Sequence, residues 1–497
     1  MAAPAALAAP RGLELAPLGR PVHARAAAHR GPAVSAALAS LQRSGAITQP
    51  TYSGYLAAYL AAAHSLTRLS GTRRAELGAV IANVQAIAAA GGFIPSRLPA
   101  LFLTLERNRQ RWTTEPLPSP GERVSFPQSL LVWQYYPGQG IEIQWLGTFG
   151  EANGYYLSGH ENNSLRQLLG EVLPLATKRA GGIAWEYMFK FDGGLPPWTS
   201  GLSQGTALQV LARAFSRFKQ AEYLSAAQQA LGIFQIPPPE GVRVATPAGA
   251  LYAEYTYAPG DRILNGFIQS LVGLYDYTSI TKDPLGLALF EAGDAEARTL
   301  VPQYNTGGWS LYDQYGESDL SYHELLTEFL QHLCERTRKG PPLTPAGTPS
   351  TGAPEAAPAA ASTGAGGTAA ARAARAVALA AQAATQPIAA DAIYCTTAQQ
   401  FGTDLHTPPV VTLLTNKLSG GTRAGVEISL SKISTVELTV RQGSRVVWSN
   451  SATVEHGDPK LLWLTPSGGG SFSVTLSARD LVGNFSTAVG TIVVSHR

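Results

Sequence analysis

Four segments in the middle of the chain combine Tyr and Trp with carboxylates and with Gly or Pro turns. Aromatic faces cover the apolar faces of sugar rings, and polar side chains bind sugar hydroxyls. A carboxylate or a phenol beside such a ring can also transfer a proton. The combination indicates a sugar-binding cleft, with ordinary loop packing as the alternative for any one segment. The segments are Trp185–Trp198, Gly201–Thr206, Glu254–Asp276 and Tyr304–His323.

The third segment contains a predicted helix over Arg262–Tyr277. Polar residues recur there at steps of three, four and seven, opposite a row of apolar residues. A buried helix would turn this polar stripe toward a cavity, but a surface helix would show the same amphipathic pattern. The stripe is Arg262, Asn265, Gln269 and Asp276, and the apolar row is Ile263, Phe267, Leu271 and Leu274.

The elements around these segments predict a mainly helical unit. Apolar residues at steps of three and four predict helices within residues 32–112. The β-rich stretch from Ser129 to Tyr156 turns at Pro137-Gly138-Gln139-Gly140, which predicts a hairpin. No Val/Ile-rich strands alternate with the helices, so an α/α toroid is favoured over a βαβ sheet. Further helices are predicted at Leu165–Ala180, Ser200–Phe218, Ala221–Phe234, Pro284–Leu300 and Tyr322–Arg338, and a short strand at Trp185–Lys190.

The 497 residues exceed one usual domain, and composition divides them into five parts. Residues 1–31 are predicted to be a disordered tail, 32–180 a helical and β-rich part, and 181–338 an α/α domain. Residues 339–404 are an Ala/Pro/Gly-rich linker. Residues 405–497 alternate in short strands, which predicts a β-sandwich with Trp448 and Trp463 in its core. Its run Ser477–Asn484 resembles a motif of bacterial Ig-like modules, so we expect an accessory Ig-like domain without chemistry of its own.

Charge and cysteine content exclude several classes of function. The net charge is only +3, which does not suggest nucleic-acid binding. Two cysteines cannot build a disulfide framework or a Cys-rich zinc site, and a bridge between Cys334 and Cys395 and two separate thiols both remain open. No HxxxH or HExxH pair and no phosphate-binding glycine loop is present, so no metal and no cofactor are predicted. Calcium bound by dispersed carboxylates would leave no such signature.

Residues Trp185–Arg338 resemble the C-terminal domain of the D-glucuronyl C5-epimerases, which convert glucuronate to iduronate in heparosan-type polysaccharides. The resemblance implies an isomerase of the heparosan-N-sulfate-glucuronate 5-epimerase type, as in heparan sulfate biosynthesis. Its partner would be an anionic polysaccharide, and a homodimer is one expected assembly. The motifs are Pro197-Trp198-Thr199-Ser200-Gly201-Leu202-Ser203-Gln204-Gly205, Glu254-Tyr255, Leu264-Asn265-Gly266-Phe267, Gly273-Leu274-Tyr275-Asp276, Tyr304-Asn305-Thr306-Gly307, Leu311-Tyr312-Asp313 and Tyr322-His323.

Epimerisation at C5 removes a hydrogen α to a carboxylate and returns one on the opposite face of the ring. It therefore needs a neutralised carboxylate and two positioned acid/base groups. A tyrosine phenol suits one role, and a glutamate or a second tyrosine suits the other. The resemblance matches Glu254 and Tyr322 to the acid/base positions and Tyr255, Asn265 and Tyr312 to substrate-contacting positions, and we count Tyr255 among the catalytic candidates too. The further candidates for substrate contacts are Arg262, His323, Trp198, Gln204 and Lys190.

Two departures affect these assignments. The family has an arginine after the Tyr-Asp pair, whereas Gln314 and Tyr315 follow Tyr312-Asp313 here. Either the substrate carboxylate is held by another cation, Arg262 or Lys190, or the substrate differs. In addition, Glu254 and Tyr255 would point to opposite faces of a regular strand, so lining one cleft would require a bulge or bend.

Three alternatives to an epimerase remain open. A polysaccharide lyase forms the same carbanion and then expels the 4-O substituent. A glycoside hydrolase needs two carboxylates that flank the bond. A non-catalytic glycan-binding protein would bind without turnover. Carboxylates that a hydrolase could recruit are Glu186, Asp192, Glu254 and Asp313.

No apolar run approaches the length of a transmembrane helix. The first ten residues lack the basic region and the apolar core of a signal peptide, so either the protein is not exported by that route or the chain begins after its signal. Glycan chemistry and an Ig-like module favour the cell exterior. We therefore expect an extracytoplasmic or cell-surface location.

Overall fold

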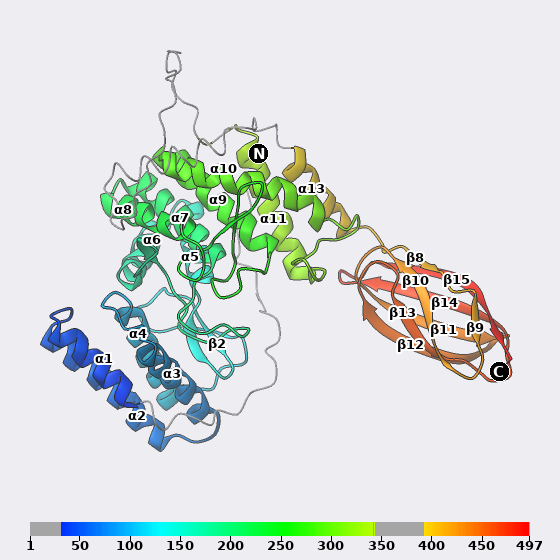
Figure 1. The fold of residues 1–497 in the computed structure, drawn as a ribbon, viewed down its shortest axis with the longest axis horizontal. Helices are drawn as coiled ribbons and strands as arrows, with labels where there is room; N and C mark the ends of the chain where they lie inside the picture. The colour runs from blue at the N-terminus through cyan, green and yellow to red at the C-terminus, as the bar shows by residue number, and fades with distance from the viewer. Residues whose placement is uncertain (1–30, 341, 343–391, 497) are drawn as a thin grey trace, which may run out of the picture. The chain divides into compact units, whose positions relative to one another are not determined.

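The computed structural model describes residues 31–340, 342 and 392–496 (Figure 1). These residues fall into two compact units. The first unit contains residues 31–260 and 269–294. The second contains residues 261–268, 295–340 and 392–496. Helices α9 (Leu264–Thr281) and α10 (Pro284–Leu300) each contribute residues to both units. The predicted tail lies outside the described residues except for Gly31, and so does the predicted linker except for its two ends.

The first unit begins with four helices that pack on one another: α1 (Gly31–Arg43), α2 (Gln49–Arg68), α3 (Gly71–Ala89) and α4 (Leu98–Thr114). Thr48 caps α2 by accepting a hydrogen bond from the Thr51 N–H, and Pro50 occupies the first turn. Apolar residues recur in α3 at the predicted steps of three and four and are buried: Leu77, Val80, Ile81, Val84 and Ile87. These helices therefore follow the sequence periodicity.

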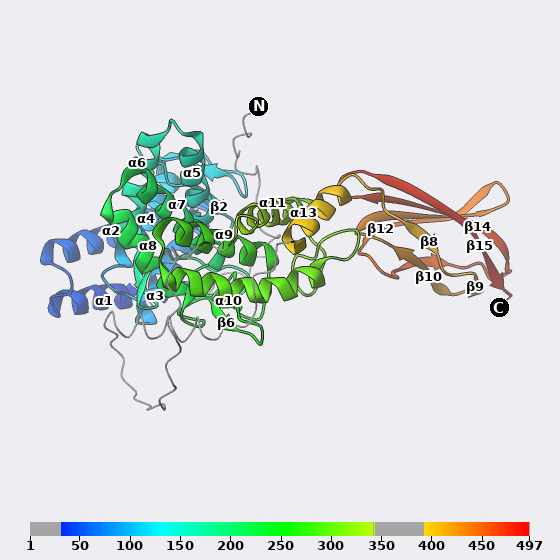
Figure 2. The same cartoon turned by 90° about the horizontal axis from the view of Figure 1, so that it is seen from above.

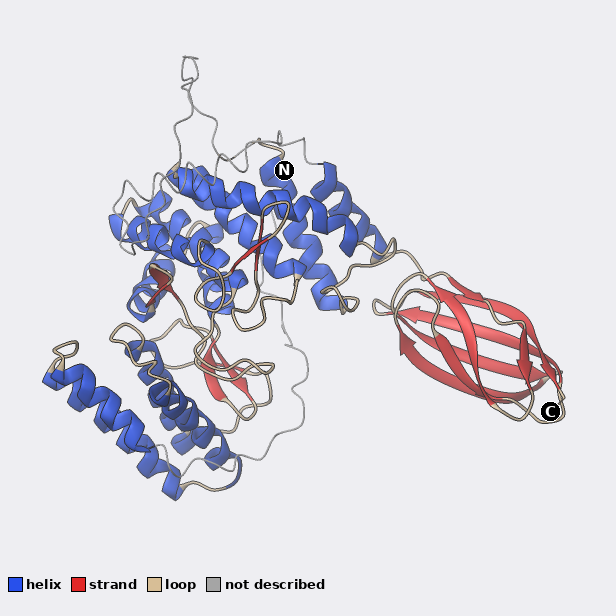
Figure 3. Cartoon of the chain, viewed as in Figure 1, coloured by secondary structure: helices blue, strands red, loops and turns tan. Residues whose placement is uncertain are grey.

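A small antiparallel sheet follows, in the order β1 (Arg123–Val124), β2 (Trp133–Tyr136) and β3 (Gly140–Ile143) (Figure 3). Its β2–β3 hairpin confirms the predicted turn. Gly140 has a φ of 87°, and an added Cβ would lie 2.5 Å from Val80 Cγ2, so this turn requires glycine. The predicted β-rich stretch to Tyr156 was wrong beyond Ile143. Residues Trp145–Ser158 form helix α5, whose N-terminus is capped by the Gln144 side chain.

The rest of the first unit alternates helices with two-stranded ribbons. Its elements are α6 (Asn162–Val172), η1 (Leu173–Leu175), β4 (Thr177–Arg179), β5 (Gly182–Ala184), α7 (Gly201–Phe218), α8 (Ala221–Ala230), η2 (Leu231–Phe234), β6 (Arg243–Ala245) and β7 (Ala250–Tyr252). The helix predicted over Leu165–Ala180 thus ends early, because β4 pairs with β5. The strand predicted at Trp185–Lys190 is only a single bridge between Tyr187 and Trp198.

The helical part of the second unit contains η3 (Val301–Tyr304), α11 (Leu320–Thr337) and α13 (Ala392–Asp404). Helices α11 and α13 lie side by side (Figure 2). Residues of α13 were assigned to the linker, and this assignment was wrong. A short Ala/Thr/Gln-rich segment gains a helix here because it packs on α11 and is tied to it by a disulfide between Cys334 and Cys395.

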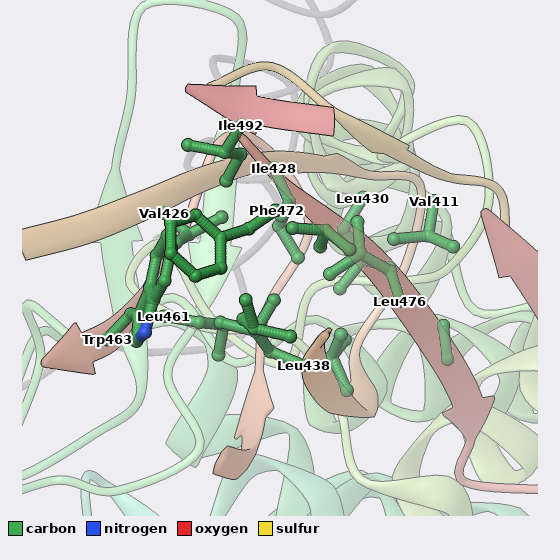
Figure 4. Close-up of a cluster of buried hydrophobic side chains, with 14 of the residues drawn as sticks. Val411, Val426, Ile428, Leu430, Leu438, Leu461, Trp463, Phe472, Leu476 and Ile492 are labelled. Carbon is green, nitrogen blue, oxygen red and sulfur yellow. The ribbon is translucent and has the colours of Figure 1, made fainter. Parts of the chain in front are cut away.

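The second unit ends in a β-rich region, Val411–Ser495, called the β domain below. Its two sheets have the strand orders β13-β10-β8 and β12-β11-β14-β15-β9. Both sheets contribute to one hydrophobic core, which includes Trp463, Phe472 and Leu438 (Figure 4). Trp463 is buried as predicted, whereas Trp448 is only partly buried. The strands are β8 (Val411–Leu413), β9 (Lys417–Ser419), β10 (Arg423–Leu430), β11 (Ser434–Gln442), β12 (Arg445–Val454), β13 (Lys460–Leu464), β14 (Gly470–Asp480) and β15 (Phe485–Ser495).

Candidate active site

Glu254 lies in the first unit, in the loop that follows β7. This loop is tied to the start of α7, because the Gly201 N–H donates to the carbonyl oxygens of Ala253 and Glu254 at 3.1 and 3.2 Å. An added Cβ on Gly201 would lie 2.5 Å from the Ala253 oxygen, so the close approach requires glycine. Glu254 and Tyr255 are therefore not on a regular strand. On a regular strand the two side chains would point to opposite faces, which is why lining one cleft with both was expected to require a bulge or bend. This restriction does not apply to a loop.

The Glu254 carboxyl group is almost entirely removed from solvent, with 7% of the residue exposed. Oε1 accepts a hydrogen bond of 3.1 Å from the Ser200 hydroxyl. Oε2 is buried and has no hydrogen-bond partner among the described residues. Burial raises the pKa of Glu254 to about 7, and the Ser200 hydrogen bond opposes that rise. Near neutral pH the carboxyl therefore exists in both protonation states, as a proton-transfer group requires.

Aromatic side chains surround this carboxyl-bearing loop. Trp198 stacks on Tyr187, with ring centroids 4.3 Å apart and an interplanar angle of 16°. Its other neighbours include Tyr255 at 5.7 Å and Tyr257 at 5.4 Å, and those two tyrosine rings stack on each other at 5.2 Å. Trp198 itself is buried, and its Nε1 donates to the Phe189 carbonyl at 2.8 Å. The cluster brings predicted residues Trp198 and Tyr255 together around the loop that carries Glu254.

Tyr187 belongs to this cluster but was not among the predicted site residues. Its hydroxyl accepts a hydrogen bond of 3.2 Å from the Leu146 N–H. Burial raises the pKa of Tyr187, and the charge of Glu254 raises it further. Tyr187 lies in the aromatic segment Trp185–Trp198, which the sequence had singled out. The sequence could not show which of the aromatic residues in this segment lies near Glu254, because that depends on the fold.

Gln204 and Lys190 have contrasting surroundings in the same unit. Gln204 is fully buried, and its side-chain amide bonds the backbone of Trp185, accepting from N–H at 3.3 Å and donating to the carbonyl at 3.0 Å. The amide therefore fixes the Trp185 backbone and has no exposed atom for a substrate. Lys190 is exposed, and its backbone N–H donates to Gln139 Oε1 at 3.0 Å.

Tyr312 and Tyr322 lie together in the second unit. Their ring centroids are 4.6 Å apart, and both residues are partly exposed. Tyr322 occupies the first turn of α11, where its N–H donates to the capping carboxylate of Asp319 at 2.8 Å. Tyr312 lies in the preceding loop, where its N–H donates to the Gly316 carbonyl at 2.9 Å. Two phenols from different elements thus share one surface.

Arg262 and Asn265 lie at the start of α9, also in the second unit. The Arg262 N–H donates to Gln314 Oε1 at 2.9 Å, and its carbonyl accepts from the Tyr304 hydroxyl at 2.5 Å. The residue itself is exposed. Asn265 is only 4% exposed, and its Oδ1 is buried without a hydrogen-bond partner within the part of the chain that the structure describes.

His323 is fully buried, so the predicted substrate contact has no exposed atom to make it. Its Nδ1 accepts from the Ser310 N–H at 3.2 Å and lies 2.9 Å from the Ser310 hydroxyl, and its Nε2 lies 3.1 Å from the Phe401 carbonyl. The ring stacks on Trp309 at 3.7 Å with an interplanar angle of 6°. Burial lowers the pKa of His323 to about 4. The neutral His323 ring therefore packs and forms hydrogen bonds inside the second unit, at the position that follows Tyr322.

Among residues 31–340, 342 and 392–496, no group of three or more His, Cys, Asp or Glu side chains is arranged to hold a metal ion. No described helix is long and apolar enough to span a bilayer.

A buried carboxyl group with a pKa of about 7 can transfer protons near neutral pH, and the aromatic rings beside its loop are residue types that also bind sugar rings. Residues 180–341 match the family described as D-glucuronyl C5-epimerase C-terminus. This match confirms, for this part of the chain, the resemblance drawn from the motifs.

Two relatives extend this comparison. A D-glucuronyl C5-epimerase of Caenorhabditis elegans is 37% identical over 133 residues, which are 24% of this chain and 22% of that protein. An uncharacterized protein of Methanocaldococcus jannaschii is 28% identical over 163 residues, which are 31% of this chain and 53% of that protein. The chain therefore spans about a fifth of the first relative and about half of the second.

Proposed function

We propose that this protein is a uronate C5-epimerase that converts D-glucuronate to L-iduronate in a heparosan-like polysaccharide. The observation that carries the proposal is the Glu254 carboxyl, which is buried beside the aromatic cluster, has a pKa of about 7 and lies within the residues that match the epimerase family. The relative in Caenorhabditis elegans, named a D-glucuronyl C5-epimerase, supports the same activity.

In the proposed reaction, Glu254 and Tyr322 are the two acid/base groups. One of them takes the C5 proton, and the electron pair of the C–H bond moves into the adjacent carboxylate as an enediolate. The other group then gives a proton to C5 from the opposite face, and exchange with water restores both side chains. Glu254 suits a role in which it changes protonation state in each cycle, because its pKa of about 7 lies near neutral pH.

The substrate carboxylate must be neutralised before its α-hydrogen can be removed. Arg262 and Lys190 are both exposed, and each is proposed as a source of that charge. Tyr255, Tyr312, Trp198 and Asn265 are proposed to contact the sugar.

Incubation of the protein with unsulfated and N-sulfated glucuronan-type polymers in heavy water tests the proposal. An epimerase incorporates deuterium at C5 while the polymer keeps its length. A shortened polymer with an ultraviolet-absorbing unsaturated uronate would instead identify a lyase, which forms the same carbanion. Absence of exchange on every uronate polymer, with binding retained, would favour a glycan-binding protein and would end the epimerase proposal.

Two further assignments belong to this proposal. The packing of α5 on α6 and α7, and of α7 on α8, supports an α/α toroid. Two sheets around one core support an Ig-like β domain. The disulfide between Cys334 and Cys395 supports an oxidising location outside the cytoplasm, because disulfides are rare in reducing compartments. Fractionation of cells followed by thiol labelling would test that location.

A further inference from the structure

The β domain contacts the loop that carries Tyr312. This loop, residues 304–318, folds back on itself through bridges between Asn305 and Ser310 and between Leu311 and Glu317. An added Cβ on Gly308 would lie 2.7 Å from the Ser431 carbonyl oxygen, so the two backbones approach too closely for any larger residue. The contact is thus built into the backbone of both segments.

A buried lysine of the β domain forms the first side-chain contact. Lys432 is 1% exposed, and its ammonium donates to the carbonyls of Asp404 and Thr407 at 2.6 Å and to Asp480 Oδ2 at 3.2 Å. The same ammonium lies 5.3 Å from the Trp309 ring centroid, within the range of a cation–π interaction. Trp309 in turn stacks on His323, the residue after Tyr322. The Lys432 ammonium therefore stabilises the stacked pair of Trp309 and His323, which links the loop to α11.

A buried glutamate forms the second contact. The Glu317 side chain is fully buried, and its Oε2 accepts from the His456 N–H at 2.8 Å and lies 3.4 Å from His456 Nδ1. The Glu317 N–H in turn donates to Glu455 Oε1 at 3.3 Å. Glu317 is paired with Leu311, the neighbour of Tyr312. The loop is thus held on both sides of Tyr312, through Trp309 and through Glu317.

We infer that the β domain is a positioning element for Tyr312 and Tyr322, rather than an accessory spacer. This inference rests on the proposed function, since it assigns those two phenols to the reaction. The two tyrosine rings are in contact, so a displacement of the loop would also displace the ring against which Tyr322 packs. The β domain would then act on turnover without touching the substrate.

The test compares full-length Glu317→Ala and Glu317→Gln with a matched control, Glu427→Ala. Alanine removes the carboxylate, whose Oε2 accepts the hydrogen bond from the His456 N–H, whereas glutamine keeps one oxygen for that N–H. Glu427 lies on β10 of the same domain in an exposed pair with Lys460, with N···O at 3.9 Å. Circular dichroism and the thermal transition of each variant establish the folded fraction before any other measurement.

Hydrogen exchange of the loop tests the contact without any assay of activity. The reporting amides are those of Leu311, Tyr312 and Ser318, which are hydrogen-bonded within the loop. We expect them to exchange about tenfold faster in Glu317→Ala, because a hydrogen bond to a buried charge is lost. Glu317→Gln and Glu427→Ala should exchange like the wild type. Wild-type exchange in Glu317→Ala would overturn the inference.

Turnover tests the consequence for the proposed reaction. We expect kcat for deuterium incorporation at C5, per folded molecule, to fall about tenfold in Glu317→Ala with KM changed less than threefold, because misplacement of an acid/base group lowers kcat. Glu317→Gln should restore kcat. If the wild type itself shows no turnover, the proposed function fails, and the exchange data alone decide the positioning contact.

His456→Ala provides the second variant if Glu317→Ala does not fold. The His456 side chain is 39% exposed, so its removal leaves the Glu317 carboxylate bonded to the backbone N–H. Loop amides that exchange about threefold faster would support the inference, since part of the contact is lost. Exchange equal to that of Glu427→Ala would refute it.

Discussion

Replacement of Glu254 by Gln should raise the stability of the protein at alkaline pH while it removes activity. The pKa of this carboxyl rises from an ordinary value of 4.5 to about 7 in the folded state, chiefly through burial. The folded protein therefore holds the proton more tightly than the unfolded chain. The contribution of Glu254 to the free energy of unfolding is therefore highest below about pH 4.5, falls as pH rises to about 7, and is constant above that range.

The size of the difference in the free energy of unfolding follows from the rise in the pKa of Glu254. A rise of about 2.5 units corresponds to about 3 kcal/mol of destabilisation at pH 8 relative to pH 4, at about 1.4 kcal/mol per unit. Glutamine has nearly the same shape and carries no charge at either pH. Glu254→Gln should therefore be more stable than the wild type by up to about 3 kcal/mol at pH 8 and nearly equal to it at pH 4.

Urea unfolding at both pH values, followed by hydrogen exchange of the first unit, measures this difference. The exposed Glu240 provides a control, and Glu240→Gln should behave like the wild type at both pH values. The same Glu254→Gln sample should show no deuterium incorporation at C5 at any pH. A stability difference that does not change between pH 4 and pH 8 would refute the assignment of a buried, protonated carboxyl. Retained activity would refute its role in proton transfer.

Three other predictions concern the neighbours of these groups. Tyr322→Phe should lower the rate of C5 exchange by about 10²- to 10⁴-fold, because a proton-transfer group is lost, while polymer binding is retained. Unchanged turnover in the exchange assay would show that Tyr322 takes no part in the reaction. Ser200→Ala removes the hydrogen bond that opposes the rise in the pKa of Glu254. The Glu254 carboxylate should then form at higher pH, so the pH–rate profile should move to higher pH. Ser200→Thr keeps a hydroxyl group and should leave the profile in place. Double replacement of Cys334 and Cys395 by Ser should destabilise α13 by about 4 kcal/mol, since the bridge closes a loop of 61 residues; amide protection of α13 equal to that of the wild type would contradict this.

Helices with a clear apolar period could be predicted from the sequence, and those that depend on distant contacts could not. Helix α10 begins and ends where its pattern predicts, at Pro284 and Leu300. Helix α5 was taken for β-rich sequence, because its aromatic residues have high strand propensity. The Gln144 cap and the burial of Trp145 and Phe149 override that propensity. Helix α13 was missed because its stabilising partner, Cys334, lies 61 residues away.

Residue types located the candidate site, but burial decided what each residue does. The motif around Glu254 predicted a carboxyl in an aromatic segment, yet its near-neutral pKa depends on burial that only the fold provides. His323 looked like a substrate ligand because it follows Tyr322. Instead, the Phe401 carbonyl and the Trp309 ring enclose the His323 ring, and Phe401 lies 78 residues after His323 in the chain. No local pattern could show either partner.

Gln314 stands directly after Tyr312-Asp313, in place of the arginine expected there, and it contacts Arg262. The Gln314 side chain accepts a hydrogen bond from the Arg262 N–H, while the Tyr304 hydroxyl donates to the Arg262 carbonyl. Both polar groups of the Arg262 backbone are thus fixed, although the residue is exposed. A cation on a fixed backbone loses less conformational entropy when it binds an anion than one on a mobile segment. The Lys190 N–H is fixed as well, by Gln139 Oε1 at 3.0 Å, so Arg262 and Lys190 both stay candidates to neutralise the uronate carboxylate in the proposed reaction.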